Sequence, residues 1–158
     1  MTDGVLHREL ADLEDTHSVG MALGALLRPP FVLGLVGDLG AGKTHLARGI
    51  VEGALPGWGV EVASPTYAIC HTHGENPWVH HLDLYRVEGD DDLESVGFWE
   101  LVEDVVLVEW PSKALSVMSV LDAVVDLRRG PGDERALSVT ARTARGRQWL
   151  AAANCSLQ

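Results

Sequence analysis

GDLGAGKT, at residues 37–44, is the stretch of this sequence that decides the fold. It matches the pattern GxxxxGK[ST], in which the backbone N–H groups of a glycine-rich loop cradle phosphates. The apolar run FVLGLV precedes it at residues 31–36, and a helical pattern follows at residues 45–51. A strand that turns directly into a helix aims successive backbone donors, and the positive end of the helix dipole, at one point. These flanks favour a nucleoside-triphosphate site over a plain glycine-rich turn.

The chemistry of the motif assigns roles to its residues. Lys43 would reach the β- and γ-phosphates, and the hydroxyl of Thr44 would bind Mg²⁺. Glycines within the loop allow positive φ and a close approach of the main chain to phosphate oxygens. The residues expected to hold the nucleotide here are Asp38, Leu39, Gly40, Ala41, Gly42, Lys43, Thr44 and His45.

A phosphate-binding loop also needs an acidic residue at the end of a neighbouring strand, which holds Mg²⁺ directly or through water. Glu109 follows four apolar residues, 105–108, the pattern of a strand buried on both faces in a parallel sheet. Asp83 follows residues 79–82, a less apolar strand. We expect Glu109 to be a metal ligand, and Asp83 to hold the metal's water shell or to orient the attacking water. Lys43, Asp83 and Glu109 are therefore the candidate catalytic residues.

The rest of the pattern predicts an α/β protein of the P-loop NTPase fold. Its mixed sheet has a parallel core flanked by helices and a C-terminal antiparallel hairpin, turned at residues 130–133. A first helix is expected over residues 15–27, with Thr16 as its N-cap and Pro29-Pro30 beyond its end. Other expected helices cover residues 90–96 and 147–153, and other expected strands cover residues 66–72, 78–84, 105–108, 123–127 and 136–141.

Composition and charge limit the class of protein. The chain has 158 residues, 46% of them hydrophobic, which suits one compact domain over residues 1–158. No apolar run is long enough to span a membrane, and no signal-peptide core opens the chain, so we expect a cytoplasmic protein with no membrane contact. Cys70 and Cys155 are expected to be reduced thiols. The formal net charge of −11 disfavours direct RNA binding as the main activity.

Several features admit two interpretations. Six arginines could form a basic patch, although a solvated edge is preferred: Arg128, Arg129, Arg135, Arg142, Arg145 and Arg147. Four histidines could suggest zinc, but their spacing fits no four-ligand pattern, so structural or surface roles are preferred: His71, His73, His80 and His81.

The Ser/Thr loop at residues 64–67 could sense a γ-phosphate, although residue chemistry alone favours a simple turn. No Asn-Lys-x-Asp motif and no arginine-bearing lid are evident, which disfavours a Ras-like GTPase and weakens a small-molecule kinase.

Four motifs in order resemble those of the bacterial TsaE (YjeE) ATPases: GDLGAGKT, SPTY at 64–67, DLYR at 83–86 and EWP at 109–111. Proteins of that family help to make N6-threonylcarbamoyladenosine at adenosine 37 of tRNA. The resemblance implies that this chain binds ATP with Mg²⁺, hydrolyses it slowly alone and docks on the TsaB–TsaD heterodimer. It also implies that tRNA is contacted only through that complex, in keeping with the acidic charge.

The resemblance extends the set of site residues. It implies that Ser64 and Thr66 belong to a switch-like loop at the nucleotide, and that the stretch from Leu13 to Thr16 lies beside the base. It implies Mg²⁺ contacts at Thr44 and Glu109, and a place near the nucleotide or the partner for Trp110. His45 stands where many relatives have a second threonine, just outside the required hydroxyl position. A small-molecule kinase and a non-catalytic nucleotide switch remain the alternatives.

Overall fold

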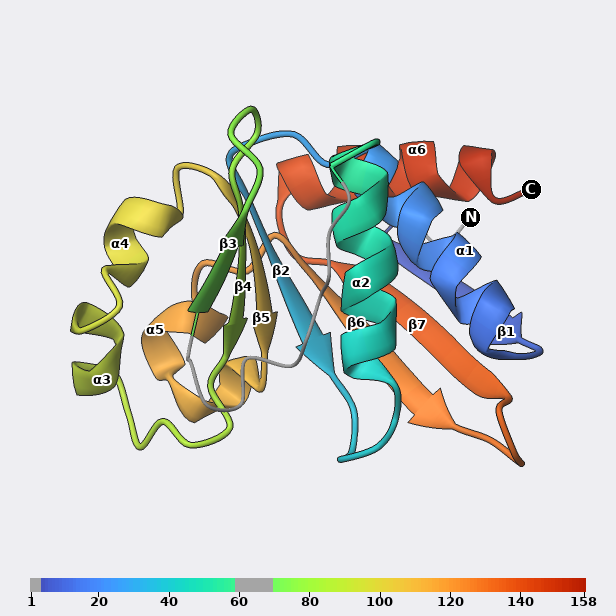
Figure 1. Cartoon of the computed structure of the whole chain (residues 1–158), viewed down its shortest axis with the longest axis horizontal. Coiled ribbons are helices and arrows are strands. Elements are labelled where there is room, and N and C mark those ends of the chain that lie inside the picture. The colour runs from blue at the N-terminus through green and yellow to red at the C-terminus, as the bar shows by residue number, and fades with distance from the viewer. Residues whose placement is uncertain (1–3, 59–69) are drawn as a thin grey trace.

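One mixed sheet organises the molecule (Figure 1). The computed structural model describes residues 4–58 and 70–158, and its strands lie in the order β1-β7-β6-β2-β5-β4-β3. The strands are β1 Val5–Leu10, β2 Phe31–Val36, β3 Cys70–His73, β4 Val79–Asp83, β5 Val105–Glu109, β6 Ala123–Arg129 and β7 Arg135–Ala141. The four central strands β6, β2, β5 and β4 run parallel. At one edge β3 pairs antiparallel with β4, and at the other β7 pairs antiparallel with β6 and β1 pairs antiparallel with β7. The predicted parallel core and late hairpin are confirmed.

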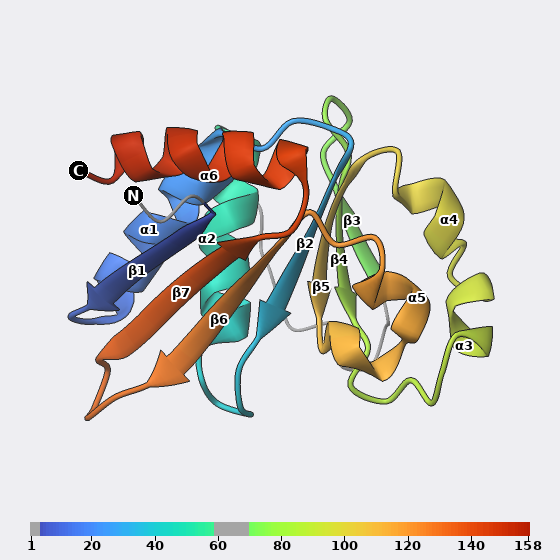
Figure 2. The ribbon, with the colours of Figure 1, turned by 180° about the vertical axis from the view of Figure 1, so that it is seen from behind.

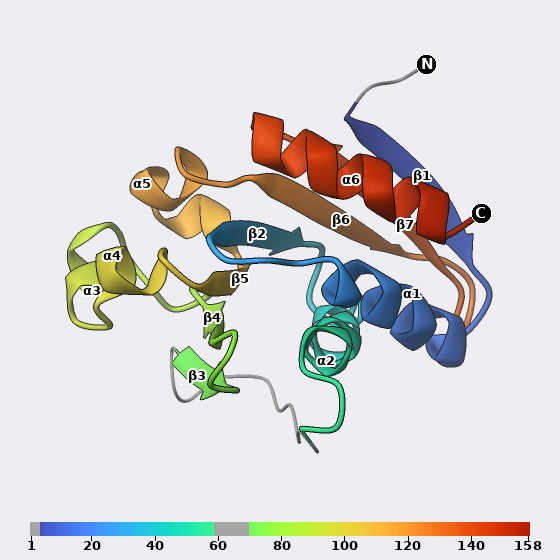
Figure 3. The same ribbon diagram turned by 90° about the horizontal axis from the view of Figure 1, so that it is seen from above.

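Helices cover both faces of this sheet. They are α1 Leu13–Ala25, α2 Lys43–Ala54, α3 Asp91–Glu94, α4 Phe98–Leu101, α5 Leu115–Met118 and α6 Ala144–Ser156, with a 3₁₀ turn η1 at Pro111–Lys113. The long helices α1 and α2 lie on one face, and α5 lies on the other (Figure 3). Seen from behind in Figure 2, α6 crosses the end of the sheet where β2 and β6 begin. No helix within residues 4–58 and 70–158 combines the length and apolarity that a membrane crossing requires.

The central strand β2 shows why the sheet is buried on both sides. Leu33 and Leu35 join the core beneath α1 and α2, whereas Val32 joins a second core with residues of α3, α4 and α5. A strand buried on both faces needs no polar alternation, which explains the continuous apolar run. Trp149 of α6 closes the first core, because its ring packs against Phe31 and its indole N–H donates to the Leu23 carbonyl at 3.1 Å.

The first helix begins earlier than expected, and the predicted cap at Thr16 is wrong. Asp12 is the N-cap, since its Oδ1 accepts a hydrogen bond from the Asp15 N–H at 2.8 Å. Thr16 lies inside the first turn, is 1% exposed, and donates its hydroxyl to the Asp12 carbonyl at 3.2 Å. Aspartate and threonine both cap helices well, so residue type alone could not decide between the two positions.

Other elements also differ from the expectation: α4, η1 and α5 are short helical segments that the pattern does not predict, and β1 and α6 differ for physical reasons that the structure shows. β1 was not anticipated, because its alternation is interrupted by charged residues and its partner β7 lies far along the chain. α6 is longer than the predicted 147–153, since Thr143 caps it by accepting the Gly146 N–H at 3.0 Å. The expected strand over 66–72 overlaps β3, although its first residues lie outside the described part of the chain.

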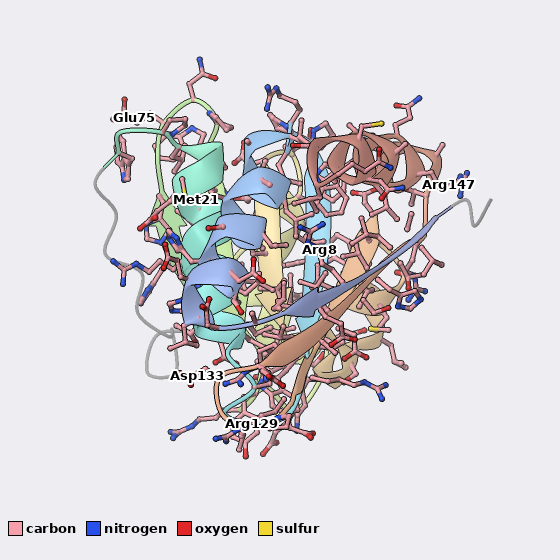
Figure 4. All side chains as sticks on the ribbon, turned by 90° about the vertical axis from the view of Figure 1, so that its right-hand side faces the viewer. Arg8, Met21, Glu75, Arg129, Asp133 and Arg147 are labelled. Atoms are coloured by element: carbon pink, nitrogen blue, oxygen red, sulfur yellow. The ribbon has the colours of Figure 1, made fainter. Side chains whose placement is uncertain are left out.

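α1 and α2 pack backbone against backbone. Four glycines line their contact: Gly20 and Gly24 in α1, and Gly49 and Gly53 in α2. A Cβ on Gly24 would overlap the carbonyl oxygen of Ile50. A Cβ on Gly53 would overlap the carbonyl oxygen of Met21, whose place on α1 beside α2 is marked in Figure 4. Because α2 begins at Lys43, within the phosphate-loop motif, this contact fixes the helix that carries the end of the loop.

We expect Gly24→Ala to lower the free energy of unfolding by about 3 kcal/mol, the upper end of the usual cost of overpacking, because neither backbone can give way locally. Urea unfolding followed by circular dichroism measures it. Gly89→Ala is the matched control, since a Cβ there meets nothing within 4 Å. A Gly24→Ala variant as stable as the Gly89→Ala variant would contradict the close contact between the helices.

Candidate nucleotide-binding site

The motif at residues 37–44 forms the turn that its sequence demands. Gly37, Gly40 and Gly42 have φ of 154°, 79° and 102°, and α2 begins at Lys43. The loop closes on itself where the Ala41 N–H donates to the Asp38 carbonyl at 3.0 Å. It lies at the carboxyl end of β2, where parallel α/β sheets bind their ligands.

Lys43 is almost buried, with 6% of its surface exposed. Its ammonium donates to the carbonyl oxygens of Gly37 and of Asp38, the latter at 3.1 Å. Burial lowers the pKa of Lys43, while the carboxylates of Glu109 and Asp83 oppose that shift. The ammonium therefore faces the loop's interior, at the place where phosphate oxygens would be received.

The two predicted acids meet across neighbouring strands. Asp83 ends β4 and Glu109 ends β5, and the register pairs the two residues directly. Glu109 is also paired with Leu35 of β2, one residue before the strand ends. Asp83 is 8% exposed and Glu109 is 3% exposed. Adjacent registers thus bring both carboxylates to the same edge as the loop, as the spacing of the apolar runs predicted.

Burial changes the acid strength of Asp83. It raises the pKa of the carboxyl, a hydrogen bond from the Tyr85 backbone N–H opposes the rise, and the nearby Glu109 carboxylate adds to it. The Tyr85 N–H donates to Oδ1 at 2.9 Å, which also fixes the orientation of the group. A carboxylate of raised pKa is a stronger base than an exposed aspartate, so Asp83 is suited to accept a proton.

Glu109 is held by a histidine that the sequence did not single out as functional. The Nε2 atom of His81 lies 2.7 Å from Oε2 of Glu109, and His81 has no exposed surface. His80, its neighbour, points to the other face and bonds Thr72 and Asp104, each at 2.8 Å. The preferred structural interpretation of these two histidines is consistent with these contacts. The spacing of His81 and Asp83, two residues apart on one strand, was the available signal that they share a face.

A cavity of about 530 Å³ joins these groups. It is lined by Leu39, Gly40, Gly42, Lys43, Thr44, His45, Arg48, Asp83, Tyr85, Glu109 and Trp110. Ligand sites commonly enclose roughly 300–1,000 Å³, so the space suits a phosphorylated ligand of nucleotide size. The hydroxyl of Thr44 and the two carboxylates supply oxygen donors, which are the ligands that Mg²⁺ prefers.

Trp110 forms one wall of the cavity at a conformational cost. Its backbone has φ of 58° and ψ of 49°, a left-handed conformation that a bulky residue adopts rarely. Its ring lies 5.1 Å from that of Tyr85, and the Lys43 ammonium stands 4.3 Å from its centre. Strain of this kind is kept where the surrounding structure requires it, often at a functional site.

The remaining predicted residues divide into two groups. His45 donates a hydrogen bond from Nε2 to the Leu13 carbonyl at 2.9 Å, so the start of α1 lies against the first turn of α2. Leu13 is 39% exposed there, whereas Thr16 is buried. A contact of this stretch with a nucleotide base stays a prediction. Ser64 and Thr66 lie outside the described residues.

Arg135 is a candidate site residue that the sequence placed in a general basic stretch. It is 6% exposed, and its Nε donates to the carbonyl of Ala41 within the loop at 2.6 Å. Its Nη1 donates to the carbonyls of Gly132 and Glu134 at 3.0 and 2.8 Å. A buried guanidinium thus supports the phosphate-binding loop from the hairpin beside it. Arg135 begins β7, which neighbours β6 in the sheet. Its proximity to the loop could therefore be inferred only if the order of the strands were known.

The other arginines do not gather into one patch. Arg128 pairs with Asp126 at 3.5 Å, and Arg145 pairs with Asp122 at 3.4 Å. Figure 4 shows Arg129 at the tip of the hairpin and Arg147 near the opposite end of the molecule. The preferred reading of these residues as a solvated edge agrees with this arrangement.

Comparisons with known proteins agree on one family. The family model described as threonylcarbamoyl adenosine biosynthesis protein TsaE matches residues 10–137. A protein of Nostoc sp. named tRNA threonylcarbamoyladenosine biosynthesis protein TsaE is 37% identical over 71% of this chain and 74% of its own. A protein of the same name from Streptomyces coelicolor is 34% identical over 85% and 93%. The crystal structure of Bacillus subtilis YdiB superposes with a TM-score of 0.77, at 25% identity, over 98% of this chain and 97% of that one.

Proposed function

The chain belongs to the TsaE family, and on that basis we propose that it is a cytoplasmic Mg²⁺-dependent ATPase of low intrinsic turnover, which supports threonylcarbamoyl transfer to adenosine 37 of tRNA. The observation that carries the proposal is the meeting of Lys43, Asp83 and Glu109 in one cavity beside the phosphate-binding loop. A loop that only connected a strand to a helix would not need the buried carboxylates of Asp83 and Glu109 beside it.

The phosphate-binding loop and Lys43 bind the triphosphate in this proposal. Residues at the start of α2 line the cavity, and the free backbone N–H groups and dipole of a helix N-terminus favour negative charge. Lys43 exchanges its bonds to the Gly37 and Asp38 carbonyls for bonds to phosphate oxygens. Arg135 holds the Ala41 carbonyl, so the loop keeps its shape while that exchange occurs.

The oxygen donors of the cavity suit Mg²⁺. Thr44 and Glu109 would hold the ion, with Asp83 near its water shell. The hydrogen bond from His81 uses Oε2 of Glu109, and no described residue bonds Oε1, which leaves that oxygen for a cation. When bound, Mg²⁺ neutralises charge on the phosphate oxygens.

Asp83 orients the attacking water and takes its proton. The water oxygen forms a bond to the γ-phosphorus, the bond from that phosphorus to the bridging oxygen breaks, and ADP leaves with the electron pair. The hydrogen bond from the Tyr85 N–H engages Oδ1 of Asp83, so Oδ2 would take the proton of the water. Lys43 balances the negative charge that collects on the transferred group.

The partners in this proposal are the TsaB and TsaD proteins. A chain of net charge −11 repels the phosphate backbone of tRNA over most of its surface. The tRNA would therefore be held by the TsaB–TsaD heterodimer, and this chain would reach it only indirectly. ATP favours docking to the extent that its γ-phosphate is contacted differently in the docked and free states.

We expect the isolated chain to hydrolyse ATP slowly and to leave tRNA unshifted in a gel assay at physiological salt. Addition of purified TsaB and TsaD should complete an assembly that modifies tRNA over many turnovers. The measurements are ATP hydrolysis and tRNA modification, each with and without the heterodimer.

Four outcomes would overturn the proposal. Tight tRNA binding by the isolated chain would contradict the indirect role. Full multiple-turnover modification without this chain would remove its function in the reaction. ADP production that depends on a small-molecule acceptor would identify a kinase, and support of modification by a non-hydrolysable ATP analogue over many turnovers would identify a switch.

A further inference from the structure

His81 occupies a position where an aliphatic residue would be expected. It lies in the middle of β4, follows Val79 on the same face, and is paired in register with Leu107 of β5. All three side chains have no exposed surface. A polar ring in such apolar surroundings loses its hydration, so it must be compensated by a specific contact.

That contact is with Glu109. Nε2 of His81 lies 2.7 Å from Oε2 of Glu109, and Nδ1 is buried with no hydrogen-bond partner among the described residues. A carboxylate only accepts hydrogen bonds, so the ring carries its proton on Nε2 and donates it. Every hydrogen bond that the ring makes to the described residues is therefore made to the candidate metal ligand.

The register explains what this bond accomplishes. Glu109 stands directly across from Asp83, whose carboxylate repels it, and its register pair lies two positions beyond that of His81, on the same face of the sheet. The donor on one side and the like charge on the other select one orientation of the Glu109 side chain. In that orientation Oε2 accepts from His81, while Oε1 has no hydrogen-bond partner among residues 4–58 and 70–158 and could bind a cation.

We propose that His81 is a positioning residue that holds Glu109 in the orientation required for Mg²⁺. The inference rests on the proposed Mg²⁺-dependent use of ATP at this site. Residues that orient metal ligands through hydrogen bonds typically contribute about 10- to 100-fold to metal affinity or activity.

The test compares His81→Leu with His81→Gln. Leucine suits the apolar face but donates nothing, whereas the glutamine amide nitrogen reaches about as far as Nε2 and restores the donor. We expect the Mg²⁺ concentration that half-saturates ATP binding, measured by calorimetry, to rise at least about 10-fold in His81→Leu and to return most of the way in His81→Gln. ATP affinity in EDTA should change by less than about threefold in both variants.

His80→Leu is the matched control, because it removes a buried histidine from the same strand but on the other face, where the ring bonds Asp104. Its Mg²⁺ titration should match that of the wild type. If His81→Leu does not fold, His81→Asn replaces it, since the shorter amide cannot reach Glu109 as glutamine does.

The possible results distinguish a failure of the proposed function from a failure of the proposed role of His81. Wild-type ATP binding that does not depend on Mg²⁺ would overturn the proposed function. A wild type that needs Mg²⁺, together with a His81→Leu titration that coincides with it, would overturn only the role of His81. Equal losses in the glutamine variant and the variant without a donor would also reject positioning by the hydrogen bond.

Discussion

Replacement of Lys43 by alanine is expected to weaken ATP binding by about 10- to 150-fold, because each charge-assisted contact contributes roughly 1.5–3 kcal/mol. The ammonium is nearly buried and faces the loop interior, so bulk water screens its attraction for a triphosphate only weakly. Calorimetric titration of ATP into the purified variant measures the loss.

The chain offers a matched control for this experiment. Lys113, the other lysine of the chain, lies with its ammonium 5.6 Å from the Tyr85 ring and holds none of the loop carbonyls that Lys43 does. Lys113→Ala removes the same charge from the same neighbourhood and should change the affinity by less than about threefold. An unchanged ATP affinity in Lys43→Ala would show that the nucleotide site has been assigned to the wrong loop.

Substitutions of the two buried acids, Asp83 and Glu109, are expected to have different effects on ATP hydrolysis. Asp83→Asn keeps the shape of the side chain and removes the base, so turnover should fall by about 100- to 10,000-fold with ATP binding largely kept. Glu109→Gln removes a metal ligand, so the half-saturating Mg²⁺ concentration should rise at least about 10-fold. Steady-state hydrolysis at varied Mg²⁺, in the presence of the heterodimer, separates the two effects.

Equal losses of Mg²⁺ affinity in Asp83→Asn and Glu109→Gln would show that the roles are divided incorrectly. Asp83 and Glu109 are paired in register and repel each other, so removal of either charge also changes the electrostatic surroundings of the other carboxylate. Substitution by isosteric amides keeps both side chains in place, so the difference between the variants reports the lost charge.

Local signals explain the parts of the site that the sequence predicted. The glycine-rich loop, Lys43 and Thr44 lie within eight consecutive residues, and the strand before them is marked by its own apolar run. Glu109 and Asp83 could be placed together because each follows a strand, and the carboxyl ends of parallel strands meet at one edge. None of these inferences required the order of strands in the sheet.

The contacts that could not be predicted all depend on distant pairing. Arg135 reaches Ala41 only because β7 joins β6 and β6 joins β2. His81 meets Glu109 only through the register of β4 on β5. In both cases a residue of ordinary type acquires its importance from a neighbour many positions away, which residue-by-residue reasoning does not reveal.

The glycine contact between α1 and α2 has a consequence for how this protein can vary. A methyl group added at Gly24 meets the carbonyl oxygen of Ile50, and every amino acid carries that oxygen. No second-site suppressor at position 50 can make room for it. At Gly34 the obstacles are the side chains of Leu121 and Pro111, 3.3 Å from an added Cβ, so a smaller residue there could restore the fit. A substitution of Gly34 can therefore be compensated by a second substitution in a neighbouring side chain. A substitution of Gly24 cannot be compensated in this way, because the obstacle is backbone.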